Sequence, residues 1–149
     1  ITLIYLAYQI RQKTAYLKQS TNSARAAAQN ASNTALRVTR ASIYESAEMS
    51  DIFFRGNADP ESLDDITRLR YRFSMQNITE VMLEIYAQTH KTGFSPETWE
   101  TQGRTLVTRT LATPGGEWFW AAYRDNYPSD FRNEVDQILR DNSGPRASS

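Results

Sequence analysis

Apolar and polar positions divide the chain into a long helical amino-terminal part and a series of shorter helices. Residues 14–54 contain no proline or glycine and are rich in alanine, glutamine, arginine and leucine, so they are predicted to form helix. Later apolar residues recur at spacings of three and four, which is typical of helices that bury one face. Strand-like alternation is absent, and the predicted fold class is all-α.

Within the first predicted helix, two sets of apolar or small residues repeat every seven positions. The first set is Ile10, Leu17, Ala24, Ala31 and Val38, and the second is Thr14, Thr21, Ala28, Ala35 and Ser42. This a/d pattern favours pairing with another helix, and small side chains allow a close approach of the two backbones. Small side chains also bury little apolar area, so an exposed alanine-rich stalk is the alternative interpretation. The candidate pairing seam, which permits self-pairing of the stem, is Leu17, Ala24, Ala28, Ala31, Ala35 and Val38.

Proline, glycine and acidic residues mark the ends of the later helices. Residues 55–57 predict the end of the first long helix, and residues 59–61 predict the start of a second helix that runs to His90. The remaining signals are a glycine stop at 91–94 and helix starts at 95–97, 113–114 and 128–130. The residues expected on the buried face of the second helix are Leu63, Ile66, Leu69, Tyr71, Phe73, Met75, Ile78, Met82, Ile85 and Tyr86. A long stem helix should therefore lead into a compact bundle of four to five helices.

The first ten residues, ITLIYLAYQI, are mostly apolar, and basic residues follow at once. Ten helical residues extend about 15 Å, which is about half the thickness of the hydrocarbon core of a membrane. The chain begins without methionine, and the run has neither a basic region before it nor a small-residue cleavage site after it. We therefore expect it to be the end of a transmembrane helix, with an apolar helix end packed on a soluble core as the alternative. The residues expected at the membrane interface are Tyr5, Tyr8, Arg11, Lys13 and Lys18.

Charge is distributed unevenly along the chain, although its net charge is zero. Residues 1–44 carry six basic side chains and no acidic one, whereas the remainder carries 17 acids against 11 bases, a net of −6. A basic segment beside a membrane helix favours the cytoplasmic side and anionic head groups. Nucleic-acid binding is not expected, because the remainder of the chain is acidic and the basic segment has no interleaved aromatic residue beyond Tyr16.

No motif in the sequence predicts catalysis. The chain lacks cysteine, which excludes thiolate-bound zinc and iron–sulfur clusters. His90 is the single histidine, with only Glu97 and Glu100 nearby in sequence, and we interpret it as a helix-end residue rather than a metal ligand. Neither a Gly-x-Ser-x-Gly motif nor a phosphate-binding loop occurs. We therefore expect no catalytic residue, no metal and no cofactor, and a protein that is not an enzyme.

The densest group of aromatic residues occurs between residues 118 and 127. Consecutive positions on a helix cannot all face one core, so at least one of Trp118, Phe119 and Trp120 should point away from the bundle. Core packing is the simplest interpretation, and a protein contact or small-ligand pocket is the alternative. The candidate partner or ligand patch is Trp118, Phe119, Trp120 and Tyr123.

A resemblance to known proteins is carried by several short stretches. They are residues 3–12, residues 59–63, Trp99-Glu100, and Pro114-Gly115-Gly116 followed by Trp118 and Trp120. These stretches resemble a loose group of uncharacterised bacterial proteins that have one N-terminal membrane helix and a helical cytoplasmic domain. The resemblance implies a single-pass protein of the bacterial inner membrane, and it carries no activity and no catalytic residue.

The function expected from these features is that of a non-enzymatic, membrane-anchored accessory or scaffolding subunit of a larger bacterial inner-membrane complex, with a respiratory or photosynthetic complex as a natural host. Its partners would be membrane lipid and other subunits of that complex. The alternative is a membrane-tethered cytoplasmic sensor or small-ligand-binding module. The expected organisation is the end of a transmembrane helix (1–10), a basic helical stem (11–55), a helical bundle (56–141) and a tail of disordered composition (142–149).

Overall fold

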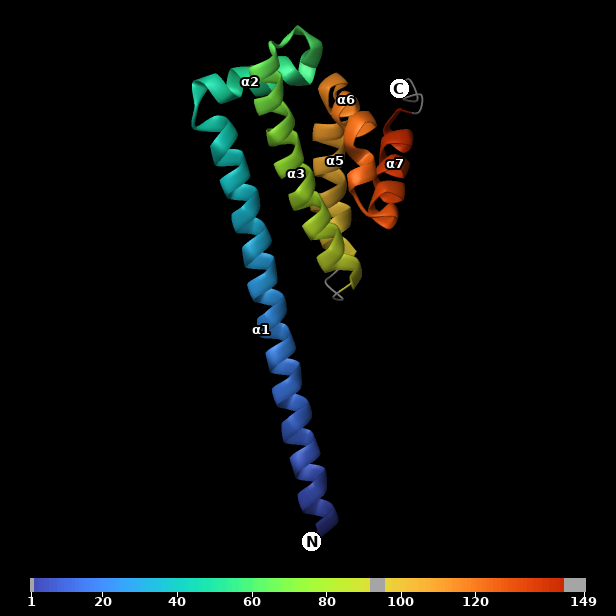
Figure 1. Cartoon of the computed structure of the whole chain (residues 1–149). Helices are drawn as coiled ribbons and strands as arrows, with labels where there is room; N and C mark the ends of the chain where they lie inside the picture. The colour runs from blue at the N-terminus through green and yellow to red at the C-terminus, as the bar shows by residue number, and fades with distance from the viewer. Residues whose placement is uncertain (1, 92–95, 144–149) are drawn as a thin grey trace, which may run out of the picture. The chain divides into compact units, whose positions relative to one another are not determined.

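Figure 1 shows the computed structural model, which describes residues 2–91 and 96–143. Throughout this described part the regular structure is helical, and a long amino-terminal helix is present, so both predictions are confirmed. The elements are α1 (Thr2–Tyr44), α2 (Ala47–Ala58), η1 (Pro60–Ser62), α3 (Asp65–Lys91), α4 (Pro96–Thr98), η2 (Trp99–Gly103), α5 (Arg104–Leu111), α6 (Pro114–Tyr123), η3 (Arg124–Asn126) and α7 (Ser129–Ser143). The chain divides into two units, which we call the amino-terminal unit (Ile1–Thr34) and the body (Ala35–Ser149) and describe separately.

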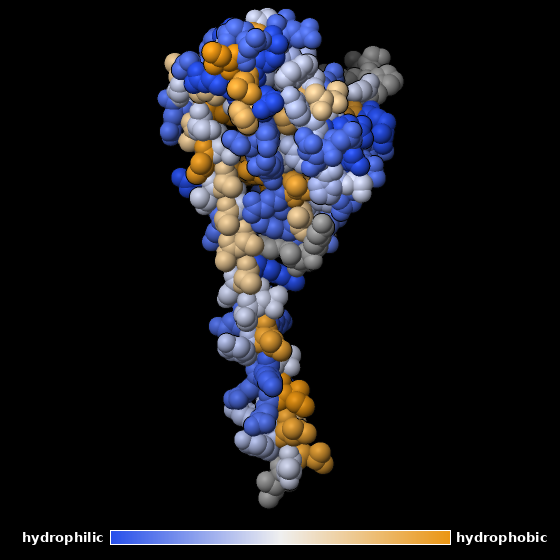
Figure 2. Space-filling model, viewed as in Figure 1, coloured by the Kyte–Doolittle hydropathy of each residue, from blue (hydrophilic) through white to orange (hydrophobic). Residues whose placement is uncertain are grey.

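The amino-terminal unit is the first part of α1, a helix without proline or glycine. Most of its side chains are exposed, including the apolar ones near the beginning of the chain. Figure 2 shows this apolar surface toward the free end of the helix. Among the residues that the structure describes, no helix has both the length and the apolar character needed to cross a membrane.

A break after α1 corrects the prediction of one continuous helix over residues 14–54. Ser46 is the N-cap of α2, and its hydroxyl accepts a hydrogen bond from the Met49 amide at 3.3 Å. Ser50 donates to the Ile43 carbonyl across the break at 2.9 Å. These serine hydroxyls satisfy backbone groups at the break, which explains why a stretch of good helix formers is interrupted here.

The start of α3 also differs from the prediction. Asp59 and Pro60 begin only the short 3₁₀ turn η1, in which the Asp59 carboxylate accepts from the Glu61 amide at 3.1 Å. The long helix begins at Asp65, where Asp64 accepts from the Ile66 and Thr67 amides at 3.1 and 3.0 Å. The Thr67 hydroxyl and amide lower the pKa of Asp64. A second aspartate cap therefore takes over the role that the sequence assigned to Asp59.

The core of the body lies along one face of α3. Its buried residues from α3 include Tyr71, Met75, Ile78, Met82, Ile85 and Tyr86, as predicted. The prediction is wrong for Ile66, Leu69 and Phe73, whose exposed fractions are 74%, 44% and 49%. At 100° per residue, Ile66 and Phe73 lie on the side of the helix opposite Met75, so the drifting apolar pattern covers two faces and only one is buried.

Two glycines allow α2 and α6 to approach each other and Tyr71 closely. A Cβ atom at Gly56 would lie 2.3 Å from the Tyr71 ring, and one at Gly115 would lie 2.0 Å from the Gly56 carbonyl oxygen. The Thr113 hydroxyl accepts from the Gly116 amide at 3.0 Å, which confirms the predicted start of α6 at Pro114. Glycine at these positions therefore lets backbone pack against backbone.

In the body, α5 and α6 pack between α3 and α7 (Figure 1). The helix made by α4 and α5 contains a π-helical turn, η2, in which Trp99 is buried and Gly103 lies against its ring. The Trp99 indole donates to Glu134 of α7 at 3.0 Å. Two sequence predictions, the glycine stop at 91–94 and the tail at 142–149, fall largely outside the described residues.

Candidate binding surfaces

The five residues predicted at a membrane interface are all exposed on α1. Gln9 donates to the Tyr5 hydroxyl and Gln12 donates to the Tyr8 hydroxyl, each at 2.9 Å. The apolar neighbours of these tyrosines are also exposed, from 81% for Leu3 to 52% for Leu6. The basic members of the group, Arg11, Lys13 and Lys18, follow immediately and are exposed as well. The helix thus presents an apolar segment and then a basic one to its surroundings.

The predicted pairing seam is divided in its exposure. Leu17, Ala24, Ala31 and Val38 are exposed, whereas Ala28 and Ala35 are partly buried. Ala35 belongs to the body and packs against its core. The exposed members leave most of the seam open to a second helix, although the small side chains offer little apolar area each.

The aromatic patch of α6 separates into two pairs. Phe119 and Trp120 are buried, and the Trp120 indole donates to Asp136 of α7 at 2.8 Å. Trp118 and Tyr123 are half-buried, and their rings meet edge to face with centroids 6.3 Å apart. Of the four residues predicted as one patch, Phe119 and Trp120 therefore belong to the core, and Trp118 and Tyr123 reach the surface.

Trp118 and Tyr123 line a groove of about 220 Å³ between α6 and the first turns of α3, which we call the Arg72 groove. Its other lining residues are Asp65, Arg68, Leu69 and Arg72. None of these four residues was predicted from the sequence to belong to a site. The available signal was the run of arginines at every second position, 68, 70 and 72, beside apolar residues that had been assigned to the core.

Arg72 is held between aromatic rings inside this groove. Its guanidinium carbon lies 4.8 Å from the centroid of the Phe73 ring and 5.5 Å from that of Tyr123. One terminal nitrogen lies 3.5 Å from the Tyr123 hydroxyl, while the buried Nε has no hydrogen-bond partner. Cation–π contacts of this kind are favourable, but they do not replace the hydrogen bonds that a guanidinium loses on burial.

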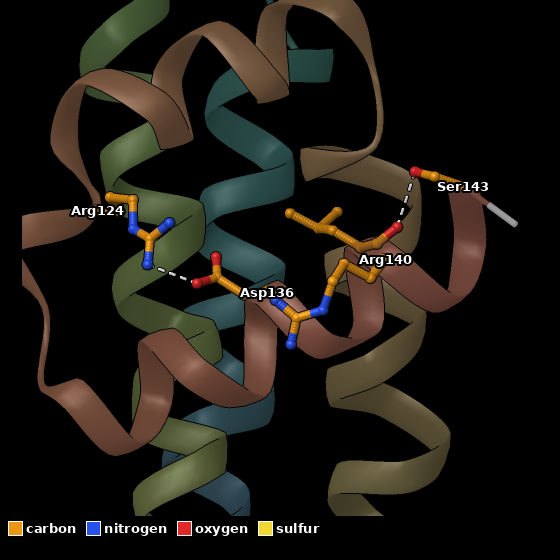
Figure 3. A pocket seen from close by; sticks show the side chains of 5 residues that line it. Arg124, Asp136, Arg140 and Ser143 are labelled. Atoms are coloured by element: carbon orange, nitrogen blue, oxygen red, sulfur yellow. Dashed lines mark hydrogen bonds and ion pairs between the residues drawn. The ribbon is translucent and has the colours of Figure 1, made fainter.

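A second pocket, of about 460 Å³, lies between η3 and α7 and is shown in Figure 3. It is lined by Arg124, Asp136, Leu139, Arg140 and Ser143. Arg124 points toward Asp136 and donates to its second carboxylate oxygen at 2.5 Å. Arg140 donates to Gln137, and Ser143 donates to the Leu139 carbonyl. The polar groups of this pocket are thus used in contacts within the chain.

His90 has an internal role near the end of α3. Its ring stacks on Tyr86 with centroids 4.2 Å apart, and its Nδ1 lies 3.0 Å from the Tyr86 carbonyl oxygen. Glu100 forms an ion pair with Arg104 at 3.4 Å. Among the residues described, no group of three or more histidine, cysteine or acidic side chains is arranged to hold a metal ion.

Burial raises the pKa values of three tyrosines, Tyr71, Tyr86 and Tyr127. Burial raises the pKa of Tyr71, whose hydroxyl donates to Asn57 at 2.8 Å. Burial, assisted by the negative charge of Glu80, raises the pKa of Tyr127 to about 12. These phenols therefore remain protonated at neutral pH.

No family model matches the chain, and comparison with curated proteins and with solved structures finds no match.

Proposed function

We propose that this protein is a membrane-anchored accessory or scaffolding subunit of a larger bacterial inner-membrane complex, with the body in the cytoplasm. The observation that carries the proposal is the exposed apolar segment of residues 3–10, which is followed directly by basic residues on the same helix. A respiratory or photosynthetic complex would be a natural host.

Lipid would bury the apolar side chains that α1 leaves exposed. Eight helical residues extend about 12 Å, so residues 3–10 would enter one leaflet of a hydrocarbon core about 30 Å thick. Tyr5 and Tyr8 suit the interface, because each has an apolar ring and a polar hydroxyl. Arg11, Lys13 and Lys18 would then lie near anionic head groups, at about 1 kcal/mol each.

The accessory role is supported by surface that the body leaves open. Ile66, Leu69 and Phe73 form an exposed apolar row on α3, in a unit whose buried core is otherwise well filled with aromatic residues. Neighbouring exposed apolar side chains that form a continuous patch often mark a contact surface for another protein. Several of them on one helix face favour a subunit that contacts another chain.

Vesicle binding tests the membrane contact. We expect the chain to bind vesicles that contain phosphatidylglycerol, and the triple variant Leu3→Ser, Ile4→Ser, Leu6→Ser to bind at least about tenfold more weakly, because it loses three apolar side chains. The matched control is Tyr16→Ser with Leu17→Ser, which removes exposed apolar residues from the same helix outside the segment. Equal binding by the triple variant and the wild type in a vesicle co-sedimentation assay contradicts the proposal.

Purification of the protein expressed from its complete gene tests the subunit role. Membranes are solubilised in a mild detergent, and the proteins that co-migrate on native electrophoresis are identified. We expect a defined set of co-migrating membrane subunits. Recovery of a monomer from the soluble fraction contradicts the proposal.

A membrane-tethered sensor or small-ligand-binding module is the second candidate. The Arg72 groove favours it, since aromatic walls and one guanidinium are suitable for a small organic acid. The volume of about 220 Å³ is below the roughly 300–1,000 Å³ typical of small-molecule sites. Saturable binding of a small carboxylate such as butyrate in this groove, followed by NMR, would favour the sensor over the accessory subunit.

A further inference from the structure

The three arginines in the first turns of α3 differ in what they bind. Arg70 forms an ion pair with Glu48 of α2. Arg68 donates to the Pro60, Glu61 and Leu63 carbonyls at 3.0, 3.2 and 2.6 Å, so it closes the η1 turn. The Arg72 guanidinium lies against the Phe73 and Tyr123 rings, and within the described ranges no carboxylate forms an ion pair with it. One guanidinium of the three is therefore without a counter-ion.

The Arg72 guanidinium lies in a groove whose aromatic walls pack against the core. Trp118 packs against buried Tyr71, with ring centroids 6.4 Å apart, and against Tyr123. Tyr123 in turn packs on buried Phe119 at 5.3 Å. Because both aromatic walls are supported by the core, the groove does not have to be ordered by its occupant.

The charge and size of the groove indicate what would fit. Arg68 and Arg72 outnumber the single acid, Asp65, whose side chain is fully exposed and lies 3.7 Å from Arg68. A carboxylate forms charge-assisted, bidentate hydrogen bonds with a guanidinium, which suits Arg better than any neutral group does. A volume of about 220 Å³ suits one acidic side chain rather than a large ligand.

The surface beside the groove indicates that this carboxylate belongs to a protein. Leu69 lines the groove and also continues the exposed row of Ile66 and Phe73. A free organic acid would occupy the groove and leave this row in water. A protein segment with apolar side chains next to an acidic one would cover both, so the charge of the groove and the apolar row are explained by one occupant.

We propose that the Arg72 groove and the Ile66–Leu69–Phe73 row form a docking surface for a partner-protein segment in which an acidic side chain is flanked by apolar ones. The acidic side chain pairs with Arg72 between Trp118 and Tyr123, and the apolar ones cover α3. This inference rests on the proposed accessory function only for the existence of a partner. Binding of such a segment in water does not require the membrane contact.

Two capped peptides that differ by one group test the proposal. The probes are acetyl-Leu-Leu-Glu-Leu-Leu-amide and the same peptide with glutamine in place of glutamate, titrated into the whole chain and followed by NMR. We expect the glutamate peptide to bind at least about tenfold more tightly and to shift the Arg72 Nε–H and Trp118 indole signals. Equal affinity of the two peptides for the wild-type chain overturns the proposal, and so does the absence of any shift at Arg72 or Trp118.

Variants of α3 separate the charge from the apolar row. Arg72→Gln should abolish the preference for glutamate, whereas Arg72→Lys should keep part of it, because lysine retains the charge but loses the planar fork. Ile66→Ser, which removes an exposed member of the row that does not line the groove, should weaken both peptides by the same factor. Arg70→Gln is the matched control and should leave the preference intact, because Arg70 is already paired with Glu48. Loss of the preference in Arg70→Gln, or its survival in Arg72→Gln, contradicts the assignment.

Titration with butyrate tests whether the groove binds a free small carboxylate or the acidic side chain of a protein segment. At the concentration that half-saturates the chain with the glutamate peptide, butyrate should cause less than about a tenth of the peptide's shift, because it cannot cover the apolar row. Equal shifts would overturn the protein-segment proposal in favour of a small-ligand site. Failure of vesicle binding with a retained glutamate preference would reject the membrane contact and leave this docking surface supported.

Discussion

The amino-terminal unit and the body are both helical, but their helices are stabilised in different ways. The amino-terminal unit has exposed side chains along almost its whole length, and its helix depends on the good helix formers that follow one another without glycine or proline. The body contains buried glycines, a π-helical turn and a helix break at Ser46. Each of these features weakens or interrupts a regular α-helix locally. Tertiary packing compensates for them there, since the core residues Tyr71, Trp99 and Phe131 are almost completely buried. Helical content alone therefore does not distinguish a helix that is stabilised by tertiary packing from one that is not.

The pairing of charged side chains also differs between the beginning of the chain and the rest of it. Residues 1–44 carry basic side chains and no acid, whereas several arginines farther along the chain form ion pairs, such as Arg70 with Glu48 and Arg124 with Asp136. Among the described residues, Arg72 is partly buried and has no ion pair, whereas other body arginines without an ion pair, such as Arg109, are exposed to water. The proposed docking surface is therefore distinguished by a partly buried guanidinium without an ion pair.

The largest effect is expected where backbone packs against backbone in the body. Gly115→Val should lower the free energy of unfolding by about 3 kcal/mol, because the new side chain would overlap the Gly56 carbonyl and the Tyr71 hydroxyl. Urea unfolding followed by circular dichroism measures the change. Ala121→Val, at an exposed position of the same helix, is the control and should cost about 0.5 kcal/mol. Similar losses in both variants would show that Gly115 is not a close contact.

A smaller effect is expected for the same chemical change made in the two units. Tyr71→Phe should cost about 1–2 kcal/mol of stability, because Asn57 loses a buried hydrogen-bond donor at 2.8 Å. Tyr16→Phe removes a hydroxyl from an exposed ring of the amino-terminal unit and should leave the urea midpoint unchanged. If both variants shift the midpoint equally, the proposed difference between packed and exposed tyrosines is wrong.

The smallest effect on the body is expected from a change in the amino-terminal unit. Ala24→Gly should destabilise its own helix by about 1 kcal/mol and reduce the helical circular dichroism signal. The urea midpoint of the body, followed by tryptophan fluorescence, should not move, since all three tryptophans belong to the body. Ala24→Gln, which keeps a good helix former, is the control. A shifted tryptophan midpoint in Ala24→Gly would show that the two units do not unfold independently.

Much of the fold followed from local signals, but several boundaries did not. The cap at Thr113 and the proline after it located α6 correctly, because a cap acts through backbone groups within a few residues. The break at Ser46 was missed, since a serine among good helix formers interrupts a helix only when its hydroxyl finds suitable backbone partners. The start of α3 was placed at Asp59 and Pro60, but Asp59 caps only the short turn η1, and Asp64 caps the long helix.

The residues that form the Arg72 groove were also only partly predicted from the sequence. Trp118 and Tyr123 belonged to the aromatic group that the sequence offered as a candidate partner or ligand patch, whereas Arg72 and Leu69 did not. Arg72 resembles Arg68 and Arg70 in sequence, and only its surroundings distinguish it from them. The prediction that Ile66, Leu69 and Phe73 belong to the core failed for a related reason, because spacing identifies an apolar face but not the element that covers it.

The sequence by itself determined that the chain is helical, that its amino-terminal part is basic and free of helix breakers, and that apolar residues precede the basic ones. These properties follow from residue type and spacing over one or two helical turns. Tertiary structure decided which apolar face of α3 is buried, which arginine lacks a counter-ion, and which two aromatic residues of α6 reach the surface. Those outcomes depend on contacts between residues tens of positions apart, and such contacts are formed only when the helices pack.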